Sequence, residues 1–396
     1  MSKRWPNVPL GEILIERQET PLAEDILSGK IRIVAKIAFN DGKIQLRESV
    51  DTKTKMILIR PGDFVISGIN AAKGGVAVYG DENSDSIAAT IHYGAYIPNK
   101  DRVNVSYLWW LLRSDTFREL LSEYVPGGIK TELKAKRLLP IPIPLPSLPE
   151  QERIVNRIEE FKQKIENALG LHQAAIKEVE ALIPATINSF LEDLKSKEVV
   201  FKYFFHEPLL NGLSIPSGRN ADGIPFLKVG CVNYGIFNPK EVKYVTIELP
   251  KSSQYWLSKG DFLISRGNSD KFVGNAAVYE GKPNPCAFPD LLIRARIDPN
   301  KGNPHFFVYV FRSSKVRKHI ESVISGTSST MKKISQPKLE EIPVPNVDLA
   351  EQNRIVDYLN LSQVKISALT RLQTKVVSEL NALLPSILDK AFNGEL

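Results

Sequence analysis

Hydrophobic residues recur with two different periods along the chain, and the two periods predict two kinds of structure. Short runs rich in β-branched and aromatic residues, such as 62–67, are bounded by Gly, Asn and Asp, which is typical of β-strands. Two segments near 150–183 and 351–384 carry apolar residues in alternating steps of four and three, which is typical of long helices. Shorter helices are expected at 105–125 and 304–324.

The two long helices keep a strict seven-residue period, which predicts a coiled-coil seam. The seam positions of the first helix are Ile154, Ile158, Phe161, Ile165, Ala168, His172, Ala175, Val179 and Leu182. Those of the second helix are Ile355, Leu359, Ser362, Ile366, Leu369, Gln373, Val376, Leu380 and Leu383. The alternative is two separate core helices, which would show a wider apolar stripe that drifts along the helix.

His172 and Gln373 are the strongly polar residues at the middle of the two seams. In an antiparallel pair of equivalent helices the central positions meet. We therefore predict that these two side chains face each other and hydrogen-bond, which would fix the register of the pair. The alternative is that each side chain points to solvent. Pro184 and Pro385 are expected to kink or end the straight part of each helix.

The chain contains an internal repeat, because similar segments recur in the same order. The run IPIPLPSLPEQERIV at 141–155 returns as IPVPNVDLAEQNRIV at 342–356. In the same way GDFVISGIN at 62–70 returns as GDFLISRGN at 260–268. Similar segments in one order indicate that one unit was duplicated.

The duplicated unit predicts four regions. Two β-rich globular domains are expected at 1–149 and 198–349, and a long helix region follows each of them, at 150–197 and 350–396. The predicted fold class is α+β. It consists of two globular domains related by a pseudo-two-fold repeat and separated by two long antiparallel coiled-coil helices.

Composition narrows the function only modestly. The 396 residues include 52 Lys and Arg against 45 Asp and Glu, and this mild excess is compatible with a polyanionic partner. Two Cys far apart in the sequence exclude a disulfide scaffold and a zinc ribbon. The start of the chain lacks the apolar stretch of a secretory signal, and no apolar run is long enough to span a membrane. The cytoplasm is therefore the expected location.

The sequence shows no motif for catalysis. Each Gly-Lys pair is followed by Ile or Pro, so the phosphate-binding loop of ATPases is absent, and no G-x-G-x-x-G follows a predicted strand. The five His form no pair at metal-ligand spacing. The run Asn284-Pro285-Cys286-Ala287-Phe288 is only faintly similar to the Asn-Pro-Pro-aromatic motif of adenine methyltransferases and is interpreted as a turn. We therefore predict no catalytic residue and no metal ligand.

The duplicated motifs resemble the specificity subunit of type I restriction–modification enzymes. The residues that carry the resemblance in the first half are Ile141, Pro142, Ile143, Pro144, Glu150, Gln151, Arg153, Ile154 and Val155. Those in the second half are Ile342, Pro343, Val344, Pro345, Glu351, Gln352, Arg354, Ile355 and Val356. The Gly-Asp-Phe segments are similar to parts of the target recognition domains of that family.

The resemblance implies that two target recognition domains bind a bipartite double-stranded DNA target. It also implies that two methyltransferase subunits dock on the helices and that restriction subunits join them to translocate and cleave DNA. S-adenosyl-methionine, ATP and Mg²⁺ would belong to those partners, and this chain would carry no cofactor. A straight helix over 150–183 would be about 50 Å long, which corresponds to roughly 15 base pairs of DNA.

Polar loops next to Gly residues are the candidate DNA contacts in each half. Asn and Arg can contact bases through paired hydrogen bonds, whereas Lys and hydroxyl groups suit phosphates. The candidates in the first half are Ser67, Asn70, Lys73, Lys130, Thr131, Lys134, Lys136 and Arg137. Those in the second half are Arg266, Asn268, Lys271, Thr327, Ser328, Ser329, Thr330, Lys332 and Lys333. The alternative for each residue is a place in a solvated turn.

Other interpretations stay open at this stage. Glu150 and Gln151 also suit the first turn of a helix, without any partner, and their repetition suggests a common structural joint. The whole chain could be a coiled-coil adaptor that binds proteins alone. It could also be the specificity subunit of a related system whose methyltransferase and nuclease are fused.

Overall fold

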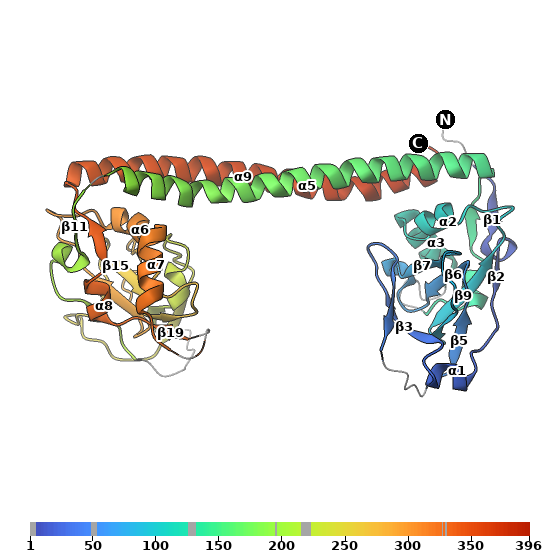
Figure 1. Cartoon of the computed structure of the whole chain (residues 1–396), viewed down its shortest axis with the longest axis horizontal. Coiled ribbons are helices and arrows are strands. Elements are labelled where there is room, and N and C mark those ends of the chain that lie inside the picture. The colour runs from blue at the N-terminus through green and yellow to red at the C-terminus, as the bar shows by residue number, and fades with distance from the viewer. Residues whose placement is uncertain are drawn as a thin grey trace. The chain divides into compact units, whose positions relative to one another are not determined.

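The chain folds into two compact units in the computed structural model, which describes residues 5–48, 54–125, 132–194, 196–214, 223–326, 328 and 331–396. Unit 1 consists of Met1–Gln173 with Lys375–Leu396, and unit 2 of Ala174–Thr374. In each unit a β-rich head packs against segments of two long helices, α5 (Leu148–Asp193) and α9 (Leu349–Phe392) (Figure 1). We call residues 5–147 head 1 and residues 196–348 head 2.

Both heads consist of short strands joined by tight turns and helices. The elements of head 1 are β1 (Asn7–Pro9), η1 (Leu10–Glu12), β2 (Leu14–Glu16), α1 (Ala23–Leu27), β3 (Arg32–Ile37), β4 (Ile44–Arg47), β5 (Met56–Ile59), β6 (Asp63–Ser67), η2 (Ala71–Lys73), β7 (Val76–Tyr79), β8 (Ile87–Thr90), β9 (Tyr93–Pro98), α2 (Val105–Leu111), α3 (Asp115–Tyr124), α4 (Ala135–Leu138) and β10 (Pro142–Pro144). Those of head 2 are β11 (Glu198–Val200), η4 (Phe201–Phe204), β12 (Leu210–Asn211), β13 (Ile224–Leu227), η5 (Val229–Val232), β14 (Val242–Val245), β15 (Phe262–Ser265), β16 (Gly267–Asn268), β17 (Ala276–Val278), β18 (Leu292–Ala295), α6 (Pro304–Arg312), α7 (Ser314–Val323), β19 (Lys332–Lys333), α8 (Gln336–Glu340) and β20 (Pro343–Pro345).

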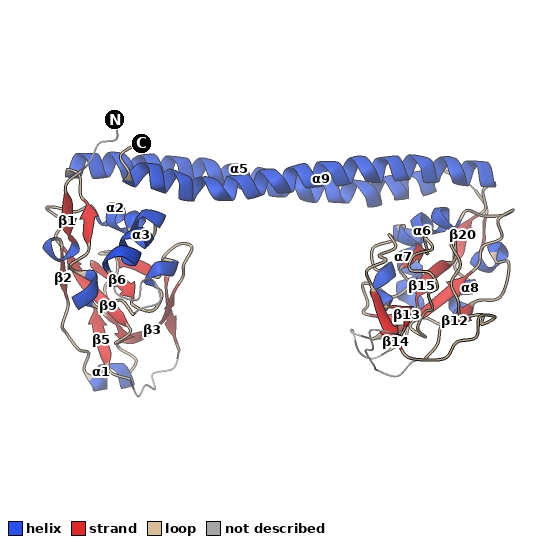
Figure 2. Ribbon diagram, turned by 180° about the vertical axis from the view of Figure 1, so that it is seen from behind, coloured by secondary structure: helices blue, strands red, loops and turns tan. Residues whose placement is uncertain are grey.

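The repeat is visible in the sheet topology. Head 1 contains an antiparallel sheet of order β2-β9-β6-β7, and head 2 contains its counterpart, β12-β18-β15-β17. Figure 2 shows the strands in red and labels β2, β6 and β9 in head 1 and β12 and β15 in head 2. In both heads the first strand pairs with the Pro-rich run that precedes the long helix, as β1-β10 and β11-β20. Head 1 has a second sheet, β4-β3-β8-β5, in which β3 and β8 run parallel. The duplication and the α+β class predicted from the sequence are thereby confirmed.

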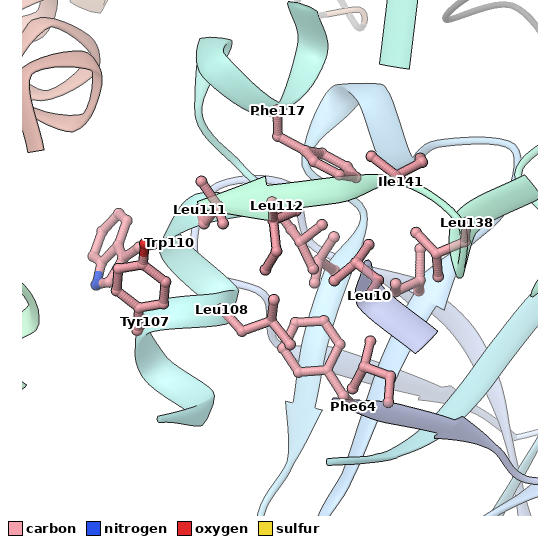
Figure 3. Close-up of a cluster of buried hydrophobic side chains, with 14 of the residues drawn as sticks. Leu10, Phe64, Tyr107, Leu108, Trp110, Leu111, Leu112, Phe117, Leu138 and Ile141 are labelled. Carbon is pink, nitrogen blue, oxygen red and sulfur yellow. The ribbon is translucent and has the colours of Figure 1, made fainter. Parts of the chain in front are cut away.

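The core of head 1 is continuous with the helix pair. Helix α2 inserts Leu108 and Leu111 among the buried side chains of the head, together with Phe64 of β6 (Figure 3). Ile154 of α5 and Phe392 of α9 belong to the same cluster. Separating the head from the helices would therefore expose apolar surface to water. The free-energy cost of this exposure is about 25 cal/mol per Å².

The Gly-Asp-Phe motif has a structural role in both heads. Gly62 and Gly260 have positive φ angles of 87° and 96°, which non-glycine residues rarely adopt. The turn brings Asp63 within 2.8 Å of the backbone N–H of Arg60, and Asp261 within 2.8 Å of that of Ser258. The buried aspartate therefore closes the turn that starts the central strand of each sheet.

The two long helices pair in antiparallel fashion. In unit 1 the start of α5 shares a core with the end of α9, through Ile158 and Leu388. In unit 2 the end of α5 shares a core with the start of α9, through Ile187 and Leu359. The rings of Phe190 and Tyr358 also contact each other there, with centroids 4.7 Å apart. The predicted antiparallel orientation is confirmed, whereas the pairing of His172 with Gln373 stays a prediction.

The predicted seam is wrong at three positions. Leu182, Leu369 and Leu383 are 48 %, 45 % and 44 % exposed. Near the end of each helix the neighbouring residue is half-buried instead, Ile183 in α5 and Leu384 in α9.

The physical reason is a local change of period. The inward positions of α5 step from Val179 to Ile183 and Ile187, two steps of four, which locally unwinds a seven-residue repeat. Pro184 and Pro385 lie within these stretches, and neither proline ends its helix, contrary to one of the two expected outcomes. The apolar residues near the end of each helix therefore pack into the core of the adjacent head instead of continuing the predicted seam.

A buried glutamine joins each helix to its head. Gln151 is 0 % exposed, and its Oε1 accepts a hydrogen bond of 2.7 Å from the backbone N–H of Asn104, in the loop before α2. Its Nε2 donates to the carbonyls of Arg102 and Pro146, at 3.0 and 2.8 Å. All three bonds bind the first turn of α5 to the backbone of head 1.

Gln352 makes the same joint in the second half. It is 0 % exposed, accepts from the N–H of Asn303 at 2.8 Å, and donates to the carbonyls of Lys301 and Val347 at 3.0 and 2.9 Å. The glutamine of the repeated Glu-Gln pair is therefore a structural joint.

Replacing Gln151 by Leu should destabilise the protein by about 2–4 kcal/mol, because one buried N–H and two carbonyls lose their partner. The measurement is the free energy of unfolding in urea. Gln163→Leu is the matched control, since Gln163 is exposed on the same helix and its replacement should change stability by less than about 0.5 kcal/mol. Equal effects of the two substitutions would contradict the joint.

Candidate nucleic-acid interface

In each head the fold brings together two polar segments that are far apart in the sequence. In head 1 the N–H of Leu133 donates to the carbonyl of Gly68 at 2.9 Å, and in head 2 the N–H of Ile334 donates to the carbonyl of Arg266 at 2.9 Å. Strands β16 and β19 extend this contact in head 2, where Asn268 lies opposite Lys332. We call residues 67–73 with 132–137 loop pair 1, and residues 265–271 with 328 and 331–333 loop pair 2.

Loop pair 1 presents cations around a turn held by its own hydrogen bonds. Ser67 is only 4 % exposed and lies 3.5 Å from the amide of Asn70, so it is not presented to a ligand. The exposed cations are Lys73, Lys134, Lys136 and Arg137. Lys130 and Thr131 lie outside the described residues.

Two of these four cations, Lys134 and Arg137, are held by hydrogen bonds to backbone carbonyls. The Nζ of Lys134 donates to the carbonyl of Ile91 at 2.9 Å, and Arg137 donates to the carbonyl of Glu132 at 3.0 Å. The hydrogen bond from His92 lowers the pKa of Glu132, which also lies 3.3 Å from Lys134. Loop pair 1 therefore also contains a carboxylate that offsets part of its positive charge.

Loop pair 2 has the same construction with different side chains. Arg266 is half-buried and donates to the carbonyl of Asp290 at 3.2 Å, while Lys332 donates to the carbonyl of Gly326 at 2.6 Å. The exposed residues of loop pair 2 are Asp270, Lys271, Ser328, Met331 and Lys333, so this loop pair also contains a carboxylate beside its lysines. Thr327, Ser329 and Thr330 lie outside the described residues.

Each loop pair contains an asparagine at the equivalent position, and its side chain hydrogen-bonds within the protein. Asn268 donates to Ser265 at 3.3 Å and to Asn233 at 3.0 Å, and Asn70 makes the equivalent contact with Ser67. Their repetition is therefore explained by the shape of the turn, and the exposed lysines are the residues best placed for an anionic partner.

An arginine on α3 of head 1 and one on α7 of head 2 hold these loops or the segment that follows them, and sequence reasoning missed both. Arg118 of α3 donates to the carbonyl of Ala72 at 3.0 Å. Arg317 of α7 donates to the carbonyl of Val273 at 2.9 Å and to Asn275 at 3.0 Å. The two arginines occupy equivalent positions of the repeat, which is the signal that could have identified them.

A second arginine of head 1 holds a neighbouring loop. Arg113 donates to the carbonyl of Asn40 at 2.7 Å and stacks on the ring of Trp109, 4.0 Å from the centroid. Burial lowers the pKa of Arg113 to about 10. The guanidinium is still charged at neutral pH and keeps the loop at 39–41 attached to α2.

Two kinds of reactive group were considered in the described residues, metal-ligand clusters and free thiols. Among them no group of three or more His, Cys, Asp and Glu could hold a metal ion. Cys231 and Cys286 are free and buried, and burial raises the pKa of the Cys286 thiol to about 12. A thiol with such a pKa is a poor nucleophile near neutral pH. A search of the described helices finds none with the length and apolar character needed to cross a bilayer.

The sequence and the fold were compared with known proteins. The family model described as type I restriction modification DNA specificity domain matches residues 2–180 and 211–376. The EcoKI specificity subunit of Escherichia coli K12 is 24% identical over 356 residues, which cover 85% of this chain and 75% of that protein. The StySPI specificity subunit of Salmonella potsdam is 24% identical over 359 residues, with the same coverage.

Solved structures have the same fold. A chain from a study of complex assembly and conformational transition of the type I R-M system superposes with a TM-score of 0.73 at 21% identity, covering 100% of this chain and 99% of that one. The HsdS subunit from Thermoanaerobacter tengcongensis gives a TM-score of 0.64 at 21% identity, covering 100% and 98%.

Arg317→Met should loosen the end of the first segment of loop pair 2 and the residues that follow it, because the hydrogen bonds that this arginine donates to residues 273 and 275 cannot form. We expect amide hydrogen exchange at 269–275 to accelerate about tenfold, as two bonds of roughly 1 kcal/mol each would allow. Lys318→Met is the control, since Lys318 is exposed on the same helix and carries the same charge. Unchanged exchange in the Arg317 variant would show that it does not anchor the loop.

Proposed function

Because this chain belongs to the type I restriction modification DNA specificity family, we propose that it recognises a bipartite double-stranded DNA target for a type I restriction–modification complex. The observation that carries the proposal is the duplication. Two heads with the same central sheet each carry an equivalent pair of loops, with exposed lysines, after the central strand, β6 or β15. A protein with two such heads suits a target with two half-sites.

In this proposal the lysines bind phosphates and position each head on the duplex. Lys73 and Lys136 would do so for head 1, and Lys271 and Lys333 for head 2. Arg266 is the residue best suited to base contact, since its guanidinium can bond two acceptors of a guanine. The differences between the two loop pairs would make the two half-sites different in sequence.

The long helices would set the distance between the half-sites. Each head is fixed to the start of one helix by a buried glutamine. The length of the helix pair would therefore determine how many base pairs separate the two half-sites. The half-site sequences and the gap between them would then depend on separate parts of the chain.

The proposed partners are two methyltransferase subunits docked on the helices and the restriction subunits that join them. S-adenosyl-methionine, ATP and Mg²⁺ would serve those partners, and this chain would be a non-catalytic subunit without a cofactor. We place the complex in the cytoplasm, where duplex DNA is accessible to it in a cell without a nucleus.

Binding of DNA by the complex of this chain with its methyltransferase subunits should weaken steeply with salt. Lys271→Gln/Lys333→Gln should lower the slope of log K against log salt by about 0.9 for each phosphate that is no longer neutralised. Lys251→Gln/Lys259→Gln is the control, because these exposed lysines of head 2 lie outside loop pair 2. A wild-type complex that binds no DNA would favour the adaptor interpretation.

Exchanging residues 198–340 for the corresponding domain of another specificity subunit should replace one half-site and leave the other unchanged. The reason is that each head has its own core and its own loop pair. Mapping methylated adenines in the genome of cells that carry the exchanged system measures this. A change in both half-sites would contradict independent recognition by the two heads.

A further inference from the structure

One turn of each head has the same backbone but a different side chain at its tip. Head 1 has Asn-Asp-Gly at 40–42, and head 2 has Asn-Tyr-Gly at the corresponding positions of the repeat, 233–235. The two glycines have φ angles of 71° and 70°, so the left-handed conformation falls at the same place in both turns. The residue before the glycine is Asp41 in head 1 and Tyr234 in head 2. The fold therefore retains the shape of the turn without requiring one kind of side chain at this position.

Tyr234 places a large aromatic ring in solvent. The residue is 71 % exposed, and the edge of its ring contacts Phe272, with centroids 5.5 Å apart. The Nζ of Lys271, in loop pair 2, lies 5.4 Å from the centroid of the Phe272 ring. Asp41 shows that the turn forms without an aromatic residue, so the packing of the head does not account for the tyrosine. Its ring is available to a ligand, and covering it would be favourable.

The turn of head 2 is bound to loop pair 2 and to the residues that follow it. The Oδ1 of Asn233 accepts a hydrogen bond of 3.0 Å from the amide of Asn268, and its carbonyl accepts one from the side chain of Asn275. Asn275 in turn accepts from Arg317 at 3.0 Å. Tyr234 follows this anchored asparagine directly. An aromatic side chain on an anchored turn loses little conformational entropy when it binds.

We propose that Tyr234 is a specificity-determining residue of head 2, and that its ring contacts the C5-methyl group of a thymine in the major groove of the DNA. This inference rests on the proposed function, in which loop pair 2 binds one half-site. The lysines of loop pair 2 suit phosphates, whereas an apolar ring suits the thymine methyl, the apolar group that base edges present in the major groove. The half-site of head 2 should therefore contain a T·A pair at one fixed position.

The equivalent residue of head 1 has a different preference. The carboxylate of Asp41 accepts a hydrogen bond of 3.0 Å from the backbone N–H of Lys43, and this bond lowers the pKa of Asp41. A carboxylate accepts a hydrogen bond from the amino group of cytosine and gains nothing from a methyl group. The two heads would therefore prefer different bases at the equivalent position of their half-sites.

The test removes the methyl group from the DNA. Deoxyuridine replaces thymidine at one position at a time in the half-site of head 2, which the exchange of residues 198–340 identifies. DNA binding is measured for the complex of the full-length chain with its methyltransferase subunits. The wild-type complex should bind about fourfold more weakly when one particular thymidine is replaced, which is the loss expected for one buried methyl group.

Variants of Tyr234 assign this loss to the ring. Tyr234→Ala should bind the thymidine DNA more weakly and show no further loss with deoxyuridine. Tyr234→Asp, which gives the turn the residue of head 1, should behave in the same way. Tyr234→Phe keeps the ring and should keep the fourfold loss. None of these variants should change the effect of deoxyuridine in the half-site of head 1.

Tyr203→Ala is the matched control. Tyr203 is 48 % exposed in η4 of head 2, and its ring contacts Phe204, with centroids 5.1 Å apart. The Nζ of Lys301 lies 5.0 Å from the centroid of this ring. Tyr203 therefore has similar neighbours but lies outside loop pair 2, so its replacement should change neither the affinity for DNA nor the effect of deoxyuridine.

The outcomes separate the inference from the proposed function. A half-site of head 2 without thymine, a wild-type complex that is insensitive to every deoxyuridine there, or a loss that persists in Tyr234→Ala and Tyr234→Asp would overturn the inference alone. A wild-type complex that binds no specific DNA would contradict the proposed function. Both tyrosines are exposed, so unchanged circular dichroism and melting temperature are expected for the variants and confirm that they fold.

Discussion

A buried glutamine at the first turn of each long helix is the interaction on which the architecture depends. Gln151 and Gln352 each use both ends of the amide to bind the backbone of a head, with nearly the same three distances in the two halves. A buried amide must satisfy its hydrogen bonds, so few orientations of the head on the helix are compatible with it. The joint therefore holds the first turn of each long helix in one orientation on its head.

The two halves have the same central sheet and the same buried aspartate, but the arginine that pairs with this aspartate comes from a different place in each head. The aspartate that closes the turn before the central strand pairs with Arg17, next to β2, in head 1, at 2.6 Å. In head 2 Asp261 pairs with Arg296, next to β18, at 2.9 Å. The buried carboxylate needs a cation, which comes from beside the adjacent strand in head 2 and from beside a strand one place further away in head 1. The loop pairs likewise differ in sequence between the two heads while the sheet order is the same.

The sequence was sufficient to predict the elements that depend on periodicity and repetition: the duplicated heads, the antiparallel helices and the recurring motifs. It was insufficient where long-range packing decides. The contact of Gly68 with Leu133 joins segments that no local pattern connects, and the neighbouring Ser67 is buried at the end of an interior strand. The seam prediction is wrong at Leu182 because the core of the head draws in Ile183 and Ile187 instead. The anchoring arginines were missed because exposed and structural arginines look alike in a sequence.

In the proposed function the length of the helix pair sets the distance between the two half-sites, and lengthening both helices together tests this most directly. Duplicating one heptad at equivalent positions, 172–178 in α5 and 373–379 in α9, adds about 10 Å at 1.5 Å per residue. The methylated adenines in cells that carry the lengthened chain should then lie in the same two half-sites, with a gap wider by roughly three base pairs. An unchanged gap, or altered half-site sequences, would contradict the account.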